Sequence, residues 1–421
     1  MARGGEKPAD SEFREELEVE ASAVLSPPPG HPRFPLLDSI RALAAISVLL
    51  VHVGLFTGGF GPWYKQVFAH ADIGVPVFFL LSGFLLYRPM LAARVLGLPR
   101  QKLGTYATNR FVRIMPAYWA VLVITALALG FNGVFTENWW VYFGLLQNLP
   151  VYTPNTACAS NPFECGVPVA WSLSIELLFY ITLPLLALLI ARISRVFRRS
   201  RWFMADAIVL TLISIVSLYI QAGTPASDLD LWLFFSPLGR GWWFALGMAL
   251  AVASVWIQQR GKEPQPARFV ARHSGLLWMV AGALYAFTAV VVLDPSPTLA
   301  FPVGNNTAYL FAVFAFGLTA LLILAPAIFG TPGGGVVRRL LRNPVLIWLG
   351  LISYGIFLWH IPVLNFLLDH GARDLLPSHQ FPVILALTLG LTIVVAALSY
   401  YLIERPLMLW VRRRASANPA A

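Results

Sequence analysis

The sequence has little charge and almost no cysteine. Only 12% of its 421 residues are Asp, Glu, Lys or Arg, whereas roughly a quarter is usual in a soluble domain, so an ordinary soluble fold is excluded. The two cysteines, Cys158 and Cys165, are too few for a disulfide framework. The sequence shows no internal repeat, Gly-rich phosphate loop or metal-ligand spacing, and no appended soluble domain is expected. A solenoid, a P-loop nucleotide hydrolase and a metalloenzyme therefore have no support.

Most of the sequence consists of long apolar runs. Hydrophobic residues make up 58% of the chain, with 14 Trp and 29 Phe. They gather in runs of about 20 residues, the length of helix that crosses roughly 30 Å of hydrocarbon. The sequence therefore predicts an all-α polytopic protein of the plasma membrane with about ten transmembrane helices. These lie near residues 37–57, 72–90, 111–130, 170–191, 204–222, 236–257, 275–293, 305–328, 345–367 and 382–403.

The basic residues alternate between the two sides of these spans. Of the 30 Lys and Arg, 26 fall in every second connection or in the two tails, and only Lys65 and Arg373 belong to the opposite loops. Because loops rich in Lys and Arg stay in the cytoplasm, both termini are predicted to be cytoplasmic. The loop with Cys158 and Cys165 is then external, where the two thiols either form a disulfide or stay free. Topology and anionic headgroups explain the net charge of +10, so no nucleic-acid partner is indicated.

The chain divides into one membrane domain and two polar tails. Residues 1–35 hold seven acidic residues before Ala21 and then the stretch SPPPGHPRFP. They predict a disordered cytoplasmic tail and not a signal peptide, because no apolar segment follows a basic start. Residues 36–410 form the membrane domain, and residues 411–421 form a basic cytoplasmic tail.

The first span, LDSIRALAAISVLLVHVG, contains three ionisable residues. Asp38 lies one turn before Arg41 and can pair with it. Arg41 and His52 lie on nearly the same face of the helix, about 16 Å apart along its axis. His52 has no ionisable neighbour in its own helix, so its partner must come from another span.

Ionisable residues of other spans lie at two matching depths. Counted from the predicted ends of the helices, the outer layer consists of His52, Glu176, His360 and the somewhat shallower Arg240. The inner layer consists of Asp38, Arg41, Arg110, Arg113 and Glu404. A charge inside the bilayer costs roughly 3 kcal/mol, so groups at the same depth are expected to meet in an interior cavity.

Each of these residues also has a purely structural interpretation. A single histidine such as His360 often makes a hydrogen bond between helices, and Glu176 can satisfy a kink or a Trp N–H. Arg110 and Arg113, three residues apart, suit headgroup anchors as well as ligand contacts. These considerations alone leave a channel, a transporter and an intramembrane enzyme open.

Local motifs favour the intramembrane enzyme among these classes of protein. After the first span come FFLLSGFLLYRP, NRFVRIMPAYW, WSLSIELLFY, SYGIFLWHIP and YYLIERP, in this order. Together with the spacing of Arg41 and His52 they resemble the acyltransferase-3 family of membrane acyltransferases, over residues 36 to about 410. Two positions depart from the family pattern: Ser39 stands where Gly is usual, and Leu177 where a second acidic residue follows Glu176.

The resemblance implies an enzyme that moves an acyl group from cytoplasmic acyl-CoA to a hydroxyl of a glycan, lipid or macrolide on the outer side. Acyl-CoA is then a co-substrate, and no bound cofactor or metal is expected. Arg41, Arg110 and Arg113 are the expected donors to its phosphates. A transporter of a lipid-linked sugar or small molecule remains the alternative, although it would be expected to show inverted repeats.

The same resemblance suggests roles for the outer layer. His52 is the expected general base, since free imidazole has a pKa near 6.5. Glu176 would orient His52 or stabilise its imidazolium, and Arg240 or His360 would stabilise the developing oxyanion. Ser82, in the SGF motif, offers a covalent route, but direct transfer is preferred.

The topology is testable by cysteine labelling. A membrane-impermeant maleimide applied to intact, reduced cells is expected to label Cys158 and Cys165, because the basic residues put their loop outside. A cysteine introduced at Gly261 is expected to label only after the cells are opened. The reverse pattern would invert the orientation.

Overall fold

The structure, a computed structural model, describes residues 33–57, 65–129, 132–135, 139–146, 167–223, 228–261, 264–293, 306–329, 335–375 and 380–417. Regular secondary structure in these residues is helical, without strands. Nine helical segments of the described chain are long and apolar enough to cross a membrane, and a bent pair can supply a tenth. The predicted all-α polytopic fold is confirmed. The orientation stays a prediction, and the acidic tail before residue 33 and the loop with Cys158 and Cys165 lie outside the described residues.

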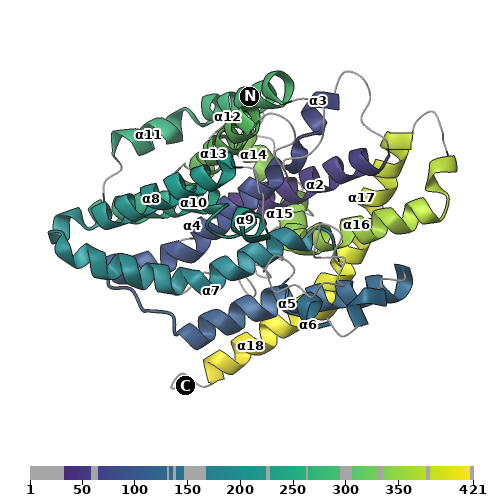
Figure 1. The fold of residues 1–421 in the computed structure, drawn as a ribbon. Coiled ribbons are helices and arrows are strands. Elements are labelled where there is room, and N and C mark those ends of the chain that lie inside the picture. Colours follow the sequence, from purple (N-terminus) through teal and green to yellow (C-terminus); the bar gives the residue numbers. More distant parts are fainter. Residues whose placement is uncertain are drawn as a thin grey trace, which may run out of the picture.

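The long helices follow the predicted spans. They are α2 (Leu36–Phe56), α4 (Gly74–Val95), α5 (Leu103–Leu129), α7 (Ala170–Ile193), α8 (Phe203–Ala222), α10 (Gly241–Arg260), α12 (Ser274–Phe287), α13 (Asn306–Ile328), α16 (Ser353–Asp369) and α17 (Gln380–Ser399). Shorter helices are α3 (Lys65–Phe68), α6 (Trp139–Phe143), α9 (Asp228–Phe234), α11 (Gln265–Arg272), α14 (Val336–Leu341), α15 (Pro344–Leu351) and α18 (Arg405–Ala417). In Figure 1, α2 runs through the middle of the bundle, and α18 lies along α5.

Two predicted spans differ in shape from a single straight helix. The span expected at 345–367 is broken: α15 and α16 meet at Ile352 with a bend of 71°. Asn343 accepts a hydrogen bond from the Val345 N–H, and Pro344 at the first position sets the backbone, which together start α15. The last span continues from α17 through a π-helical turn, Tyr400–Glu404, into α18. The predicted basic tail from residue 411 is therefore helical as far as Ala417.

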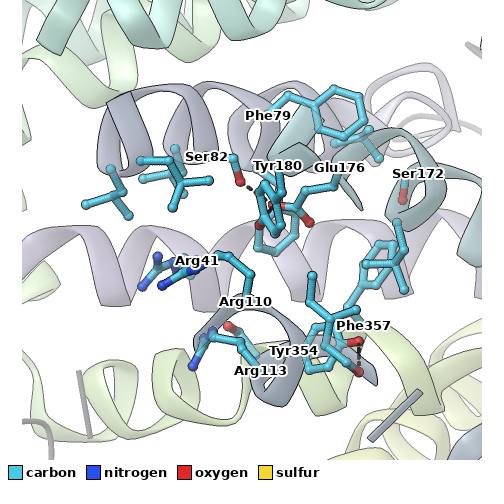
Figure 2. A pocket seen from close by; sticks show the side chains of 18 residues that line it. Arg41, Phe79, Ser82, Arg110, Arg113, Ser172, Glu176, Tyr180, Tyr354 and Phe357 are labelled. Atoms are coloured by element: carbon cyan, nitrogen blue, oxygen red, sulfur yellow. Dashed lines mark hydrogen bonds between the residues drawn. The ribbon is translucent and has the colours of Figure 1, made fainter. Parts of the chain in front are cut away.

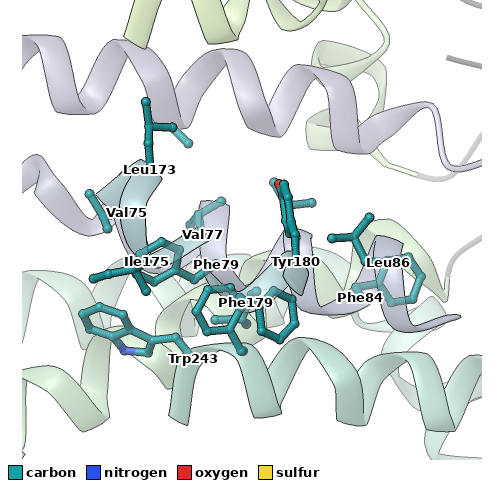
Figure 3. Close-up of a cluster of buried hydrophobic side chains, with 14 of the residues drawn as sticks. Val75, Val77, Phe79, Phe84, Leu86, Leu173, Ile175, Phe179, Tyr180 and Trp243 are labelled. Atoms are coloured by element: carbon teal, nitrogen blue, oxygen red, sulfur yellow. The ribbon is translucent and has the colours of Figure 1, made fainter. Parts of the chain in front are cut away.

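Glycines allow α4 and α10 to pack with their backbones almost in contact. A methyl group on Gly247 would lie 2.0 Å from the Leu80 carbonyl oxygen, and one on Gly83 would lie 2.4 Å from the Phe244 carbonyl oxygen. Small residues permit such approach in membranes, where packing and not water exclusion drives helix association. Beside this crossing Phe244 stacks between Phe79 and Phe179, with centroid distances of 4.7 and 4.0 Å. Figure 3 shows Phe79 and Phe179 in this cluster, which belongs to the buried hydrophobic core of the bundle.

Buried polar groups tie neighbouring helices at one end of the bundle. Asp206 of α8 is fully buried and accepts hydrogen bonds from the Tyr87 hydroxyl and, at 2.5 Å, from Arg94 Nη2. Arg88 of α4 donates to Ser254 Oγ at 2.9 Å and to Gln258 Oε1 at 2.6 Å in α10. Helices α4, α8 and α10 are therefore fixed by polar contacts as well as by the aromatic cluster.

The close approach at Gly247 gives a prediction about stability. Gly247→Ala is expected to lower the thermal unfolding midpoint of the purified protein, because its methyl group collides with the α4 backbone; overpacking typically costs about 1–3 kcal/mol. Gly282→Ala in α12 is the control, since no atom lies within 4 Å of its added methyl group. Equal midpoints for the two variants would contradict the packing of α4 against α10.

Candidate active site

A pocket opens between five helices that are distant in the sequence. It encloses about 800 Å³, including space open to the surroundings, and is lined by side chains of α2, α4, α5, α7 and α16. Figure 2 shows that its arginines lie at one end and Ser172 at the other, with Glu176 between them. The polar groups of this pocket therefore come from separate spans, and they combine three arginines of the predicted inner layer with Glu176 of the predicted outer layer.

The arginine end of the pocket gathers three cations. Arg41 of α2 donates to Asp38 Oδ1 at 3.0 Å, the pairing expected from their spacing in the helix. Arg110 of α5 lies over the ring of Tyr180 at 5.9 Å, and Arg113 is 3.9 Å from the Met408 sulfur. Among the described residues neither Arg110 nor Arg113 forms an ion pair. The Glu404 carboxylate still lies within electrostatic range of Arg113. An anion that enters the pocket therefore meets guanidinium groups that can pair with it.

The centre of the pocket is built around Glu176. Its Oε1 accepts hydrogen bonds from the hydroxyls of Ser82 in α4 and of Tyr180, which lies one turn further along α7. Tyr106 of α5 donates to the Tyr180 carbonyl at 3.0 Å, so α4, α5 and α7 are joined here. Tyr180 is not among the predicted site residues, although its position four residues after Glu176 puts both side chains on one helix face.

Apolar side chains form the remaining walls. They are Val75, Phe78, Phe79, Leu81, Leu85, Leu86, Ile114, Leu173 and Phe357. Tyr354 fixes α16 to α5 by donating to the Ile114 carbonyl at 2.8 Å. A slender, mostly apolar chain with a few amide or hydroxyl groups suits such walls.

His52 and His360 form a pair beside the pocket. His360 Nε2 lies 3.3 Å from His52 Nδ1, and the ring centroids are 5.0 Å apart. Phe357 connects the pair to the pocket wall: it lines the pocket, and its ring centroid lies 6.0 Å from that of His360. His360 is fully buried and His52 half-buried. The partner that His52 needs from another span is thus a histidine, while the hydrogen bonds of Glu176 go to Ser82 and Tyr180.

Arg240 lies in an aromatic cage at the start of α10. It is 1% exposed, and its guanidinium carbon lies 4.8–5.8 Å from the ring centroids of Phe234, Phe235, Trp171 and Trp243. Its Nη1 donates to the Tyr309 hydroxyl at 3.2 Å, and that hydroxyl donates to Gln221. Trp243 contacts Phe79, which lines the pocket, at a centroid distance of 5.9 Å. Arg240 therefore lies behind the aromatic wall.

The other residues of the predicted layers do not add a metal site. Glu404 is fully buried in the π-helical turn before α18. In the described part of the chain no three His, Cys, Asp or Glu side chains come together as metal ligands would. The polar side chains of the pocket are thus three arginines, one carboxylate and five hydroxyls, with the histidine pair nearby.

Comparison with known proteins identifies relatives along most of the chain. Residues 34–401 match the family model described as an acyltransferase domain. A Komagataeibacter xylinus protein named as a candidate membrane-bound transacylase, BcsY, is 28% identical over 88% of this chain and 81% of its own length. The peptidoglycan O-acetyltransferase OatA of Listeria monocytogenes is 25% identical, and a candidate O-acetyltransferase of Staphylococcus aureus strain COL is 24% identical.

The matches to OatA and to the Staphylococcus protein cover 89% and 88% of this chain, but only 55% and 57% of those proteins. No solved structure matches the chain. The family match begins just before α2 and ends just beyond α17, so it includes each pocket-lining side chain. With its membrane-spanning helices, the chain therefore belongs to the acyltransferase-3 family of multi-pass membrane O-acyltransferases.

Proposed function

We propose that this enzyme takes an acyl group from cytoplasmic acyl-CoA and transfers it to a hydroxyl of an acceptor on the outer side of the membrane. One observation carries the proposal: a single pocket has three arginines at one end and apolar walls, and a histidine pair lies next to its wall residue Phe357. The acceptor class is a cell-envelope glycan, with an exported lipid or a macrolide-like molecule as the alternatives. The name of one relative, peptidoglycan O-acetyltransferase, supports the glycan.

The charge of the arginines indicates which end of the pocket binds acyl-CoA. The phosphates of acyl-CoA carry several negative charges on a nucleotide head, and guanidinium groups bind phosphate through paired charge-assisted hydrogen bonds. Arg41, Arg110 and Arg113 supply such groups at one end of the pocket. The narrow pantetheine arm would then extend along the apolar walls, past the polar centre at Glu176. This arrangement brings the thioester toward Phe357 and the histidine pair.

The chemical step that we propose is direct transfer. His52 takes the proton of the acceptor hydroxyl as the oxygen attacks the thioester carbonyl. The C–S bond then breaks, and the proton on His52 passes to the CoA thiolate, so the products are the acyl ester and free CoA. Ser82 donates to Glu176 inside the pocket, which makes it the residue of a covalent alternative in which Glu176 removes the hydroxyl proton.

The donor assignment can be tested by removing both arginines of α5. The double variant Arg110→Ala/Arg113→Ala is expected to weaken binding of acetyl-CoA at least tenfold, because charge-assisted contacts contribute about 1.5–3 kcal/mol each. Binding is measured by calorimetry on protein in lipid nanodiscs. The matched control is Arg195→Ala/Arg198→Ala, two exposed arginines with the same spacing. An affinity equal to that of the control would reassign Arg110 and Arg113 to lipid anchoring.

The general base can be tested at His52. His52→Ala is expected to lower transfer from radiolabelled acetyl-CoA to envelope material by roughly 10²- to 10⁴-fold, because it removes the proton acceptor. Acetyl-CoA affinity should persist, since Arg41, Arg110 and Arg113 remain. His52→Asn and His52→Gln distinguish catalysis from structure: an amide keeps a hydrogen bond between helices but cannot act as a base. Near-normal turnover in either amide variant, normalised to protein amount, would rule out this role.

A further inference from the structure

The histidine pair is held by two backbone carbonyls, each one turn earlier in its own helix. His52 Nδ1 lies 2.7 Å from the Val48 carbonyl oxygen, and His360 Nδ1 lies 3.2 Å from the Ile356 carbonyl oxygen. The two rings then meet through His360 Nε2 and His52 Nδ1 at 3.3 Å. Neither ring forms an ion pair with the described residues. Every described polar contact of both rings is therefore a backbone carbonyl or the other ring.

These contacts determine where the protons of two neutral rings lie. A carbonyl oxygen only accepts, so each Nδ1 that faces one carries the hydrogen. His360 Nε2 is then a bare acceptor, and it faces the Nδ1–H of His52, which is shared between Val48 and His360. His52 Nε2 is the nitrogen left without a hydrogen. The lone pair of His52 Nε2 is thus free to accept a proton, as a general base requires.

We propose that His360 is the positioning residue of His52. Its Nε2 accepts from His52 Nδ1–H, which keeps the base in the tautomer with Nε2 free and holds its ring in one orientation. When Nε2 of His52 takes the acceptor's proton, the positive charge spreads to Nδ1–H, and His360 stabilises it by accepting the same hydrogen bond. This inference rests on the proposed role of His52 as base.

The geometry also argues against His360 as an oxyanion donor, a role considered from the sequence. Its only N–H is directed to the Ile356 carbonyl, and the other nitrogen has a lone pair. A developing oxyanion would be repelled by that lone pair. His360 thus acts on the reaction through His52, in the position that a carboxylate occupies in hydrolase triads, but without a buried negative charge.

The surroundings of His360 keep its ring in place. The residue is 0% exposed in α16 and lies eight residues after the break at Ile352. The ring of Phe357, one turn before it, lies 6.0 Å from the His360 ring and also lines the pocket. A buried ring with a fixed backbone partner has little freedom to turn away, which is what a positioning residue requires.

Kinetics of two substitutions test the proposal. His360→Leu is expected to lower kcat by roughly 10- to 10³-fold, less than the roughly 10⁴-fold seen when a triad loses its charged orienting group. The KM for acetyl-CoA should change less than twofold. His360→Glu, which supplies an acceptor without an N–H, should retain more activity than His360→Leu. The matched control is His370→Leu: His370, exposed at the end of α16, bonds the Phe366 carbonyl in the same way, and its loss should leave kcat unchanged.

Nitrogen-15 NMR of histidine-labelled protein in nanodiscs gives a second readout that needs no active variant. We expect both rings as Nδ1–H tautomers, and a shift of the His52 Nδ1 signal in His360→Leu. A His52 proton on Nε2, an unchanged His52 signal, or a His360→Glu variant less active than His360→Leu would overturn the proposal. If His52→Ala were inactive while His360→Leu kept full kcat, only the pairing would be wrong. Full activity of His52→Ala would instead overturn the base itself.

Discussion

The cost of burying charge in hydrocarbon constrains the whole structure. An ionisable side chain inside the bilayer costs roughly 3 kcal/mol unless other groups of the protein surround it. Arg41 meets Asp38, Arg94 meets Asp206, and Arg240 lies among four aromatic rings. Arg110 and Arg113 differ, since neither forms an ion pair in the described part of the chain, although Glu404 lies within electrostatic range of Arg113. Both guanidinium groups line the pocket, where an anionic ligand can pair with them.

Backbone geometry brings these groups together. Gly350 allows α15 to approach α2 so closely that a methyl group there would lie 2.1 Å from the Asp38 carbonyl oxygen. The 71° bend at Ile352 then directs α16 along a new axis, and His360 reaches His52 across 308 residues of sequence. A straight helix over the same span would follow the direction of α15. The break is therefore as important for the site as the side chains themselves.

The depth of each ionisable side chain along its helix could be predicted from the sequence. The rotation of each helix about its own axis could not. Apolar run lengths located the spans, and the three-residue spacing of Asp38 and Arg41 predicted their ion pair, because both signals are local. Counting residues put His52, Glu176 and His360 in one layer without saying which would touch. Whether His52 contacts His360 or Glu176 depends on the orientation of α7 and α16 about their helix axes. Long-range packing determines that orientation. No proline marks the break at Ile352, and the flanking Gly350 and Gly355 do not by themselves distinguish a bend from close helix packing.

The separation of Arg41 and His52 by ten residues has a physical explanation in this arrangement. A guanidinium close to His52 would raise the free energy of its imidazolium and oppose proton uptake, whereas phosphate binding requires guanidinium groups. Two like charges repel by about 4 kcal/mol at 4 Å but only about 1 kcal/mol at 16 Å, at an effective dielectric constant near 20. One helix can therefore contribute to both tasks only if they are about three turns apart. Phe357 adjoins both regions, since it lines the pocket that holds the arginines and its ring lies 6.0 Å from that of His360. The extended pantetheine arm of the proposed donor is the element that could bridge this separation, with phosphates at one end and thioester at the other.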